Sequence, residues 1–502
     1  MALYLSTSFE IFITFYREIR YVNTIPKVIT ILTSMQSTYT QEKNSKNNPE
    51  NSPFLAKNVN DKFDNPLNTK MKADTLRFPL PTVPKCLNNF FAIGAIAQVI
   101  ILIFMGCFTT WPKTDAGANG AGSVATNLYD VTQYAVLMDI MVMIFVGFAV
   151  LFCLIPKYGW SGISIALLIG AMAFEWNMPM RGLIRDAGVP KAEVGAITVT
   201  IDYLAESVFA SASILIACAG VLGRTSLEQL VILMFFGVPF YNFNGWVCDQ
   251  IGFSDTGGTI IIHAFGAFFG FGCSWVLGHD SSHSMKRRGS DEGNYHTNIF
   301  ALLGTILLWI YYPSFNGYAV TGVAKFRACF NTQLALMAAA VTSIVLSDLK
   351  EDLKKNMMIH MQTGVLAGGV TLGTLADHPI EPWGAMLLGS VGATVCVLGI
   401  RFVTPFLEEK LNVHDTCDCM ALHGIPAFIS VFASCISFAV ADENEPDEVD
   451  YAIAYVDGIC GKNIACIFVT AALATVFGVF TGGIMGMFSR DDHWYDSSAH
   501  FD

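Results

Sequence analysis

The chain has 502 residues, of which 53% are hydrophobic and only 14% are charged, and its mean hydropathy is +0.49. Soluble domains carry about 25% charged residues and do not build one core from a chain of this length, so a soluble enzyme and a disordered chain are excluded. The formal net charge of −12 argues against a nucleic-acid-binding protein. Because the apolar runs are continuous rather than alternating, they indicate membrane-spanning helices.

The first part of the chain differs in composition from the rest. Residues 40–75 are rich in Asn, Lys, Asp and Pro, and such a composition cannot bury a core. We expect residues 1–85 to form a disordered or dispensable N-terminal extension. A membrane domain is predicted at 87–488, followed by a short cytoplasmic C-terminal tail at 489–502.

The membrane domain is predicted to be all-α and polytopic, with twelve transmembrane helices. A spanning helix needs about 20 consecutive apolar residues, and twelve stretches from Leu87 onward meet this requirement. Their expected bounds are 87–110, 131–155, 159–179, 194–221, 226–250, 257–278, 297–318, 327–348, 357–377, 382–404, 420–441 and 459–487.

An even number of spans places both termini on the same side of the membrane. More Lys and Arg residues lie in the connections on that side, including Lys286, Arg287 and Arg288 between the sixth and seventh spans. Because cytoplasmic loops carry an excess of basic residues, the sequence predicts cytoplasmic N- and C-termini.

Two spans share a short pattern that indicates an internal repeat. The sixth contains His263-Ala-Phe-Gly-Ala-Phe and the eleventh contains His423-Gly-Ile-Pro-Ala-Phe. If the first span is extra, spans two to six and seven to eleven form two halves of five helices. Halves with an odd number of helices are inverted in the membrane, and transporters built this way place their site between the halves.

His263 and His423 are therefore the candidate functional residues. An ionisable side chain inside a spanning segment is costly and suggests function. One interpretation is two unrelated histidines, each bound to a backbone carbonyl. The other is a facing pair, in which one imidazole donates a hydrogen bond to the other and the two titrate as a unit. Such a pair in an apolar lining could take a proton from ammonium and pass ammonia on.

The other candidate sites have simpler interpretations. His360 and His378 lie near the ends of the ninth span and are expected to be structural. Cys417 and Cys419 lack a second pair at metal-binding spacing, so we expect no metal site. No nucleophile, base and acid set is found in the spans, so we expect no enzyme activity and no cofactor.

Several stretches, which follow one another in the expected order along the chain, resemble the Rh glycoprotein branch of the ammonium transporter (Amt/Mep/Rh) family. They are DIMVMIFVGF (139–148), SDTGGTIIIHAFGAFFG (254–270), GTILLWIYYPSFN (304–316), HMQTGVLAGGVTLGT (360–374), VTPFLEEKL (403–411) and HDTCDCMALHGIP (414–426). The resemblance covers about four fifths of the chain, and the extra first span is also typical of Rh proteins.

The resemblance implies a homotrimer in the plasma membrane, with one narrow pore for ammonium or ammonia in each subunit. It implies that His263 and His423 are the twin pore histidines. Phe209 and Phe315 match the phenylalanines that close the outer mouth, although ordinary packing is their alternative. Asp255 matches a family acid, and we expect it to be structural, capping the sixth span.

Two departures from the family pattern concern the outer mouth. Val208 occupies the position of the family acid before the first gate phenylalanine, and Gly245 occupies that of the acid on the fifth span. Alternatives to ammonium transport are conduction of carbon dioxide through the same apolar pore and a non-transporting membrane scaffold or ammonium sensor. The segment from Met71 resembles the short leader of Rh proteins, so residues 1–70 are expected to be dispensable for folding and transport.

Overall fold

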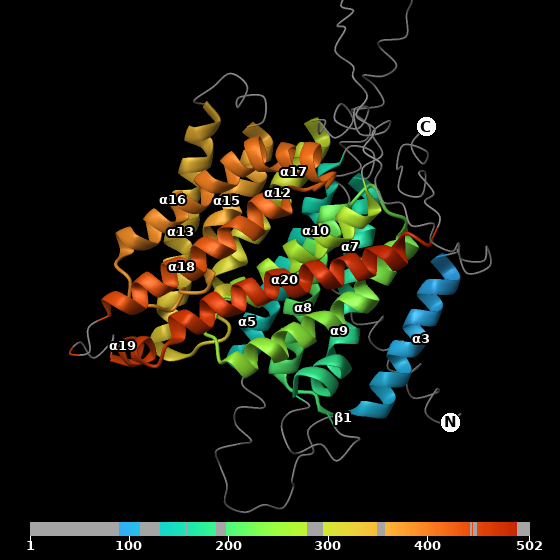
Figure 1. Cartoon of the computed structure of the whole chain (residues 1–502), viewed down its shortest axis with the longest axis horizontal. Coiled ribbons are helices and arrows are strands. Elements are labelled where there is room, and N and C mark those ends of the chain that lie inside the picture. Colours follow the sequence, from blue (N-terminus) through green and yellow to red (C-terminus); the bar gives the residue numbers. More distant parts are fainter. Residues whose placement is uncertain are drawn as a thin grey trace, which may run out of the picture. The chain divides into compact units, whose positions relative to one another are not determined.

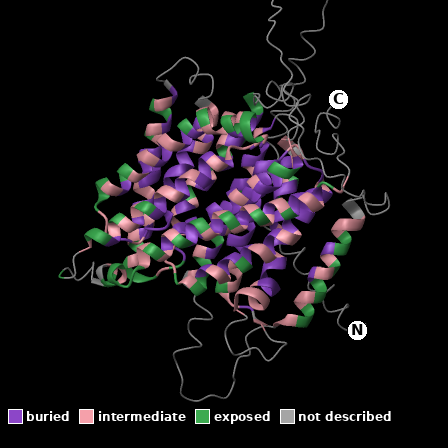
Figure 2. Cartoon of the chain, viewed as in Figure 1, coloured by how far each residue is buried: buried purple, intermediate pink, exposed green. Residues whose placement is uncertain are grey.

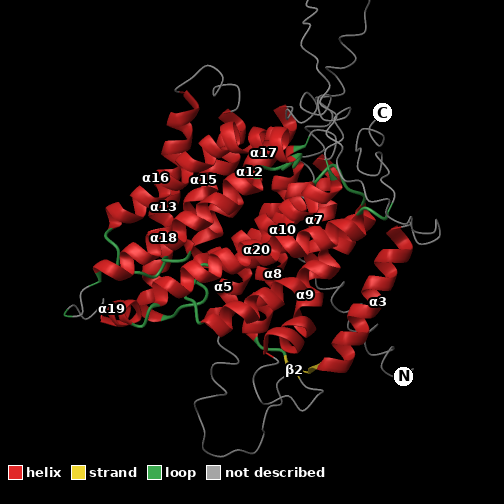
Figure 3. Ribbon diagram, in the orientation of Figure 1, coloured by secondary structure: helices red, strands yellow, loops and turns green. Residues whose placement is uncertain are grey.

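The computed structural model describes residues 90–110, 131–155, 159–186, 197–278, 295–348, 357–441, 444 and 449–488. The expected N-terminal extension (1–85) and C-terminal tail (489–502) lie outside the described residues. Most of the described residues are helical, and the strand residues are confined to one short pair (Figure 3). In that pair, β1 (Thr109–Thr110) runs parallel to β2 (Ile197–Thr198).

The helices up to the middle of the chain form the first half of the fold, together with the extra first helix (Figure 1). They are α3 (Phe90–Phe108), α5 (Val131–Val142), η2 (Met143–Phe148), α6 (Ala149–Leu151), η3 (Phe152–Leu154), α7 (Gly159–Met180), η5 (Arg181–Arg185), α8 (Ile201–Val221), α9 (Leu227–Ile251), η7 (Thr259–Ala264) and α10 (Phe265–Leu277).

The second half of the fold and the last helix follow. Their elements are α12 (Tyr295–Asn316), α13 (Gly322–Asp348), α15 (Met357–Gly373), α16 (Pro382–Leu398), η8 (Gly399–Val403), α17 (Thr404–Leu411), η9 (Met420–Gly424), α18 (Ile425–Val440), α19 (Val449–Val456) and α20 (Ile459–Met485). The elements η2, η5, η7, η8 and η9 are π-helical, whereas η3 is a 3₁₀ turn.

The predicted all-α, multi-pass membrane fold is confirmed. Ten helical stretches in the described part of the chain are long and apolar enough to cross a membrane, and they fall on ten of the predicted spans. The first and ninth predicted spans are occupied by α3 and α15, which are 19 and 17 residues long. A short helix between the last two spans, α19, was not predicted.

Several helix ends differ from the prediction for local reasons. The fourth span begins at Ile201 rather than 194, because the Thr200 side chain accepts a hydrogen bond from the Tyr203 N–H and caps the helix. The tenth span continues through η8 and α17 to Leu411, beyond the predicted end at 404. It ends where Asn412 adopts a left-handed conformation with φ 57°.

The most deeply buried helices are α8 and α10, which lie in the centre of Figure 2. Close helix contacts in the fold depend on small residues, as is usual where helices pack in a membrane. Gly270 of α10 lies against the backbone of Ala217 in α8, and Gly389 of α16 lies against Ala335 of α13. A Cβ atom at Gly389 would stand only 2.0 Å from the Ala335 carbonyl oxygen.

We therefore expect Gly389→Ala to separate α13 from α16 and to destabilise the protein by about 3 kcal/mol. Gly384→Ala is the matched control, because a Cβ atom at this position of the same helix has nothing within 4 Å. Thermal unfolding of the purified proteins in detergent measures both effects. Equal melting temperatures for the two variants would contradict the close contact.

Candidate functional site

The structure brings His263 and His423 together in the interior. Their Nδ1 atoms are 3.1 Å apart, and the two rings are nearly parallel, with centroids 5.1 Å apart. Because a hydrogen bond needs one donor and one acceptor, one ring carries a proton on Nδ1 and the other does not. The Tyr312 hydroxyl lies 3.2 Å from Nε2 of His263. Tyr312, His263 and His423 therefore form a continuous chain of hydrogen-bonding groups.

Both histidines lie in π-helical turns, which often occur at functional sites. His263 is in η7 and His423 is in η9, so each begins a spanning helix. Each turn follows an aspartate that caps it, Asp255 in one case and Asp415 in the other. The extra residue of a π turn changes which side chains face the neighbouring helix, and here the imidazoles face each other.

Asp255 lies where the sequence placed it, at the start of the sixth span. Its carboxylate accepts hydrogen bonds from the N–H groups of Thr259 (2.9 Å), Ile260 (2.7 Å) and Ile261 (3.2 Å), and from the Thr374 hydroxyl (3.0 Å). Burial raises the pKa of Asp255 to about 6, and these hydrogen bonds oppose that shift. Asp255 therefore fixes the N-terminus of η7 rather than facing His263.

The repeat extends further than the sequence analysis found. An Asp-Thr pair precedes each histidine at the same distance along the chain. The pair at 255–256 precedes His263, and the pair at 415–416 precedes His423. The Gly257 N–H donates to the carbonyl of Gly373 at the end of α15, and the Thr416 N–H donates to that of Gly220 near the end of α8. The fourth and ninth spans thus hold equivalent positions, as expected for two related halves.

A narrow cavity of about 20 Å³, room for about one water-sized molecule, lies beside the histidine pair. Apart from the two imidazoles and the Tyr312 hydroxyl, its lining is hydrocarbon. The lining residues are Met143, Ile144, Phe148, Leu151, Ala212, Ile216, His263, Leu308, Tyr312, Phe315, Leu366, Leu422 and His423. A neutral solute can enter such a space at little cost, whereas an ion that has lost its water cannot.

A group of aromatic rings packs beside this cavity. Phe209 of α8 and Phe315 of α12 pack edge to face, with ring centroids 4.9 Å apart. The Phe315 ring is also 5.8 Å from the His263 ring, and the Tyr318 ring packs edge to face with Phe209 at 5.7 Å. The structure therefore places Phe315 next to His263, with Phe209 packed against Phe315.

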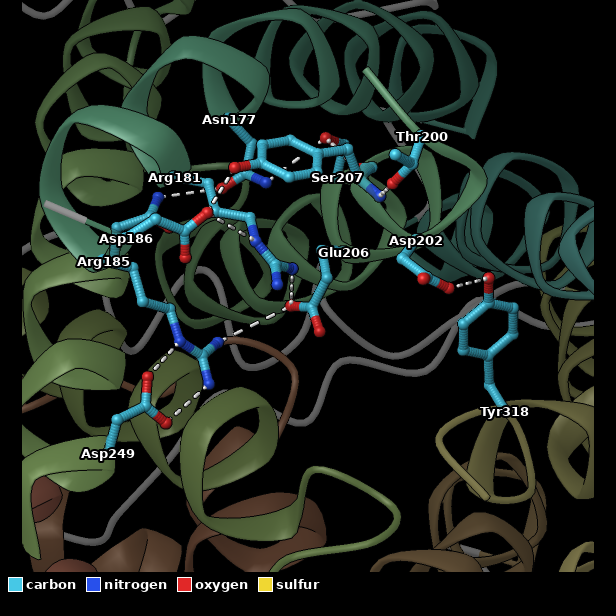
Figure 4. A network of polar contacts seen from close by, with 12 residues as sticks. Asn177, Arg181, Arg185, Asp186, Thr200, Asp202, Glu206, Ser207, Asp249 and Tyr318 are labelled. Carbon is cyan, nitrogen blue, oxygen red and sulfur yellow. Dashed lines mark hydrogen bonds and ion pairs between the residues drawn. The ribbon is translucent and has the colours of Figure 1, made fainter. Parts of the chain in front are cut away.

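Beyond the phenylalanines lies a group of charged residues, which we call the mouth cluster: Arg181, Arg185, Glu206 and Asp249 (Figure 4). Arg185 forms two hydrogen bonds with Asp249, at 2.6 and 3.0 Å. Glu206 lies 3.1 Å from Arg181 and 3.6 Å from Arg185. Sequence analysis missed both arginines, although their spacing at the end of the third span was a signal.

The mouth cluster gives a physical reason for one departure from the family pattern. A Cβ atom at Gly245 would lie 3.2 Å from the guanidinium of Arg185, so a larger residue here would displace that arginine. Val208 is fully buried, so a carboxylate at this position would lie away from solvent. Asp202 remains exposed and accepts a hydrogen bond from the Tyr318 hydroxyl at 3.4 Å.

Removing Arg185 should leave the Glu206 and Asp249 carboxylates close together without their shared partner. We expect Arg185→Ala to destabilise the protein by about 1–2 kcal/mol, less than for a fully buried pair because Asp249 is partly exposed. A second substitution, Asp249→Ala, should recover part of this loss. Melting temperatures of the two single variants and the double variant measure the coupling, and strictly additive losses would contradict it.

The competing histidines and the cysteine pair lie outside the cavity. Nδ1 of His360 is 2.8 Å from the Ser347 hydroxyl, and Nδ1 of His378 is 2.9 Å from that of Ser437. The Cys419 thiol donates to the Ile216 carbonyl at 3.3 Å. Within the described ranges, no group of three His, Cys, Asp or Glu side chains is arranged to hold a metal ion.

Comparison with known proteins agrees with this architecture. The model of the Ammonium Transporter Family matches residues 96–490. The Ammonium transporter Rh type A of Bos taurus is 32% identical over 419 residues, which are 82% of this chain and 94% of that protein. The Ammonium transporter Rh type C of the same species is 33% identical, over 82% of this chain and 89% of that protein.

Solved structures are similar in fold. Nitrosomonas europaea Rh50 superposes with a TM-score of 0.63 at 30% identity, covering 75% of this chain and 92% of that one. Saccharomyces cerevisiae Mep2 superposes with a TM-score of 0.56 at 17% identity, covering 74% of this chain and 92% of that one, a likeness of fold alone. Together, the family match over most of the chain and the Rh relatives establish that this chain belongs to the ammonium transporter family, on its Rh branch.

Proposed function

We propose that the chain carries ammonium or ammonia across a membrane through the cavity lined by His263 and His423. The observation that carries this proposal is the contact between the two Nδ1 atoms, 3.1 Å apart, in an otherwise apolar lining. The Rh relatives that resemble the chain over most of its length are named as ammonium transporters. Membership in this family favours a transporter rather than an enzyme.

The apolar lining determines the form in which the substrate passes. Ammonium that leaves water loses strong hydrogen bonds, and hydrocarbon walls replace none of them. Ammonia is neutral, and an imidazole nitrogen can hydrogen-bond to it. Protons can also shift along the chain of Tyr312, His263 and His423, because either imidazole can be the donor in their shared hydrogen bond. The pair thus provides a place where the cation gives up a proton and the neutral molecule continues.

The remaining residues hold this path in place. Phe209 and Phe315 are the proposed gate at the outer mouth, since their rings must separate before a solute reaches His263. Asp255 is the proposed structural acid, which fixes the turn that carries His263. The mouth cluster pairs Glu206 with two arginines, so Asp202 is the carboxylate most available to attract cations.

We further propose a homotrimer in the plasma membrane with both termini in the cytoplasm. Large exposed apolar side chains occur on several helices, among them Phe326 on α13 and Trp383 on α16. Such surface needs either lipid or a neighbouring subunit. Light scattering with correction for bound detergent gives the subunit number, and a monomer would contradict this part of the proposal.

Growth of a yeast strain that lacks its own ammonium transporters tests the function. On limiting ammonium, the wild-type chain should restore growth, whereas the double variant His263→Ala/His423→Ala should not. Both proteins must be present at the membrane in equal amounts. A scaffold or an ammonium sensor does not move the solute, so failure of the correctly located wild type to restore growth would favour either of those roles.

A second candidate substrate is carbon dioxide, because the apolar lining suits any small neutral molecule. Stopped-flow measurements on proteoliposomes separate the two, since ammonia entry raises the internal pH and carbon dioxide entry lowers it. The histidine pair adds hydrogen-bonding groups that carbon dioxide does not require. We therefore expect the double histidine variant to lose the first signal and to keep any second one.

A further inference from the structure

Two cysteines outside the cavity lie against each other where α18 crosses α20. The thiol of Cys435 is 3.6 Å from the carbonyl oxygen of Cys460, and the thiol of Cys460 is 3.7 Å from the carbonyl oxygen of Cys435. Each sulfur atom therefore lies on the backbone of the other residue. This reciprocal arrangement brings each sulfur atom within reach of the other cysteine, as a disulfide requires.

The surroundings of this pair allow close approach and access. The neighbouring residues Ser434 and Asn463 also bridge the two helices, since the Asn463 side-chain amide donates to the Ser434 hydroxyl at 3.4 Å. Cys435 and Cys460 are only partly buried. The neighbouring Gly458 and Gly461 have nothing within 4 Å of where a Cβ atom would be, so the start of α20 is open. The two thiols are therefore not enclosed by the protein.

A second cysteine contact on α20 provides an internal comparison. The Cys466 thiol is 3.9 Å from the Cys248 carbonyl, whereas the Cys248 thiol is directed to the Thr470 hydroxyl at 3.5 Å. This contact is not reciprocal, and both residues are fully buried. Neither its geometry nor its access matches that of Cys435 and Cys460.

We propose that Cys435 and Cys460 form a redox-active thiol pair, which closes reversibly into a disulfide that ties α18 to α20. The oxidant is a low-molecular-weight disulfide. The thiolate of one cysteine attacks it, forms a mixed disulfide and releases one thiol. The second cysteine then attacks the protein sulfur of the mixed disulfide and releases the other thiol. Overall, two protein thiols are oxidised by two electrons, and the reagent is reduced to two thiols.

The bond would close a loop that contains α19. The Tyr451 hydroxyl of α19 already donates to the carboxylate of Asp377, at 2.9 Å, so α19 is held in place without the disulfide. A covalent link at the base of the loop removes conformations from the unfolded chain and should raise stability. One of the linked residues, Cys435, lies on the helix-and-turn unit, η9–α18, that carries His423. The disulfide would therefore hold that unit against α20.

Oxidation of the full chain in detergent with oxidised glutathione tests the proposal. After alkylation and digestion without reductant, mass spectrometry should find the peptides of Cys435 and Cys460 joined, with the loss of two hydrogen atoms. The linked species should vanish in Cys435→Ser and in Cys460→Ser, remain in the matched control Cys466→Ser, and disappear with reductant. Complete alkylation of both thiols after oxidation, or loss of the linked species in Cys466→Ser, would overturn the pairing.

Thermal unfolding of the same samples tests whether the disulfide stabilises the protein. The oxidised wild type should melt at a higher temperature than the reduced wild type, and oxidant should not shift Cys435→Ser. An unchanged melting temperature in fully linked protein would overturn the stabilising role. None of these readouts measures transport, so they are independent of the proposed function.

Discussion

Replacing either His263 or His423 with Ala should reduce ammonium flux sharply, by roughly a hundredfold if the pair moves a proton. The two imidazoles share one hydrogen bond, so removal of either leaves the other without its partner. The double variant should therefore lose little more than each single variant, because residues that act as one unit are not additive. Flux into proteoliposomes, normalised to folded protein, provides the measurement.

A purely structural pair predicts a different result. Two separate packing contacts would give poor yield of folded protein and losses that add. His360→Ala is the matched control, since this histidine is equally buried but bonds to Ser347 outside the cavity. The control should keep its flux per folded molecule. If all three variants of the pair are folded and conduct at the wild-type rate, the paired-histidine mechanism is wrong.

Asp255→Ala should cause the largest loss of folded protein. Asp255 accepts three backbone N–H groups at the start of η7 and one hydroxyl, all in the interior. Hydrogen bonds to a charged group contribute about 1.5–3 kcal/mol each, so we expect a loss of at least about 3 kcal/mol.

Two further variants serve as an intermediate case and a control for this prediction. Asp255→Asn keeps one oxygen acceptor and should fall between wild type and Asp255→Ala. Asp202→Asn removes the charge of an exposed carboxylate with one long hydrogen bond, so it should stay near wild type. Thermal unfolding, monitored by size-exclusion chromatography, ranks the four proteins by stability. A wild-type melting temperature for Asp255→Ala would contradict the capping role.

The sequence predicted the helices well because the membrane imposes a simple rule. Every backbone polar group must be bonded within the segment, so each long apolar run becomes a helix. The rule does not determine where a helix ends in the polar region. The extension of the tenth span to Leu411 contains Glu408, Glu409 and Lys410. Because these residues are charged, a search for apolar runs ends before them.

Part of the candidate site was also predictable. The short repeat around His263 and His423 was enough to suggest that they face each other, and the structure brings them into contact. Their π-helical turns were not predictable, since the sequence carries no periodic signal for one extra residue in a turn. The role of Tyr312 was missed for a different reason. It lies on another helix, and only the tertiary fold places its hydroxyl beside His263.

The pairing of charges within the mouth cluster could not be predicted from sequence patterns alone. Glu206 and Asp249 were visible as acids within apolar spans, but their partners Arg181 and Arg185 follow the end of another span. Pairing across three helices is a tertiary property. The same is true of Gly245, whose small size matters because the Arg185 guanidinium occupies the space beside it.

The most direct test of the central claim is the rate at which an ammonium gradient raises the internal pH of proteoliposomes. The passage of ammonia through the cavity at His263 and His423 predicts a faster rise with the wild-type protein than with protein-free vesicles of the same lipid. The double histidine variant should return the rate close to that of the empty vesicles. A wild-type protein that is folded, inserted and no faster than protein-free vesicles would contradict the account.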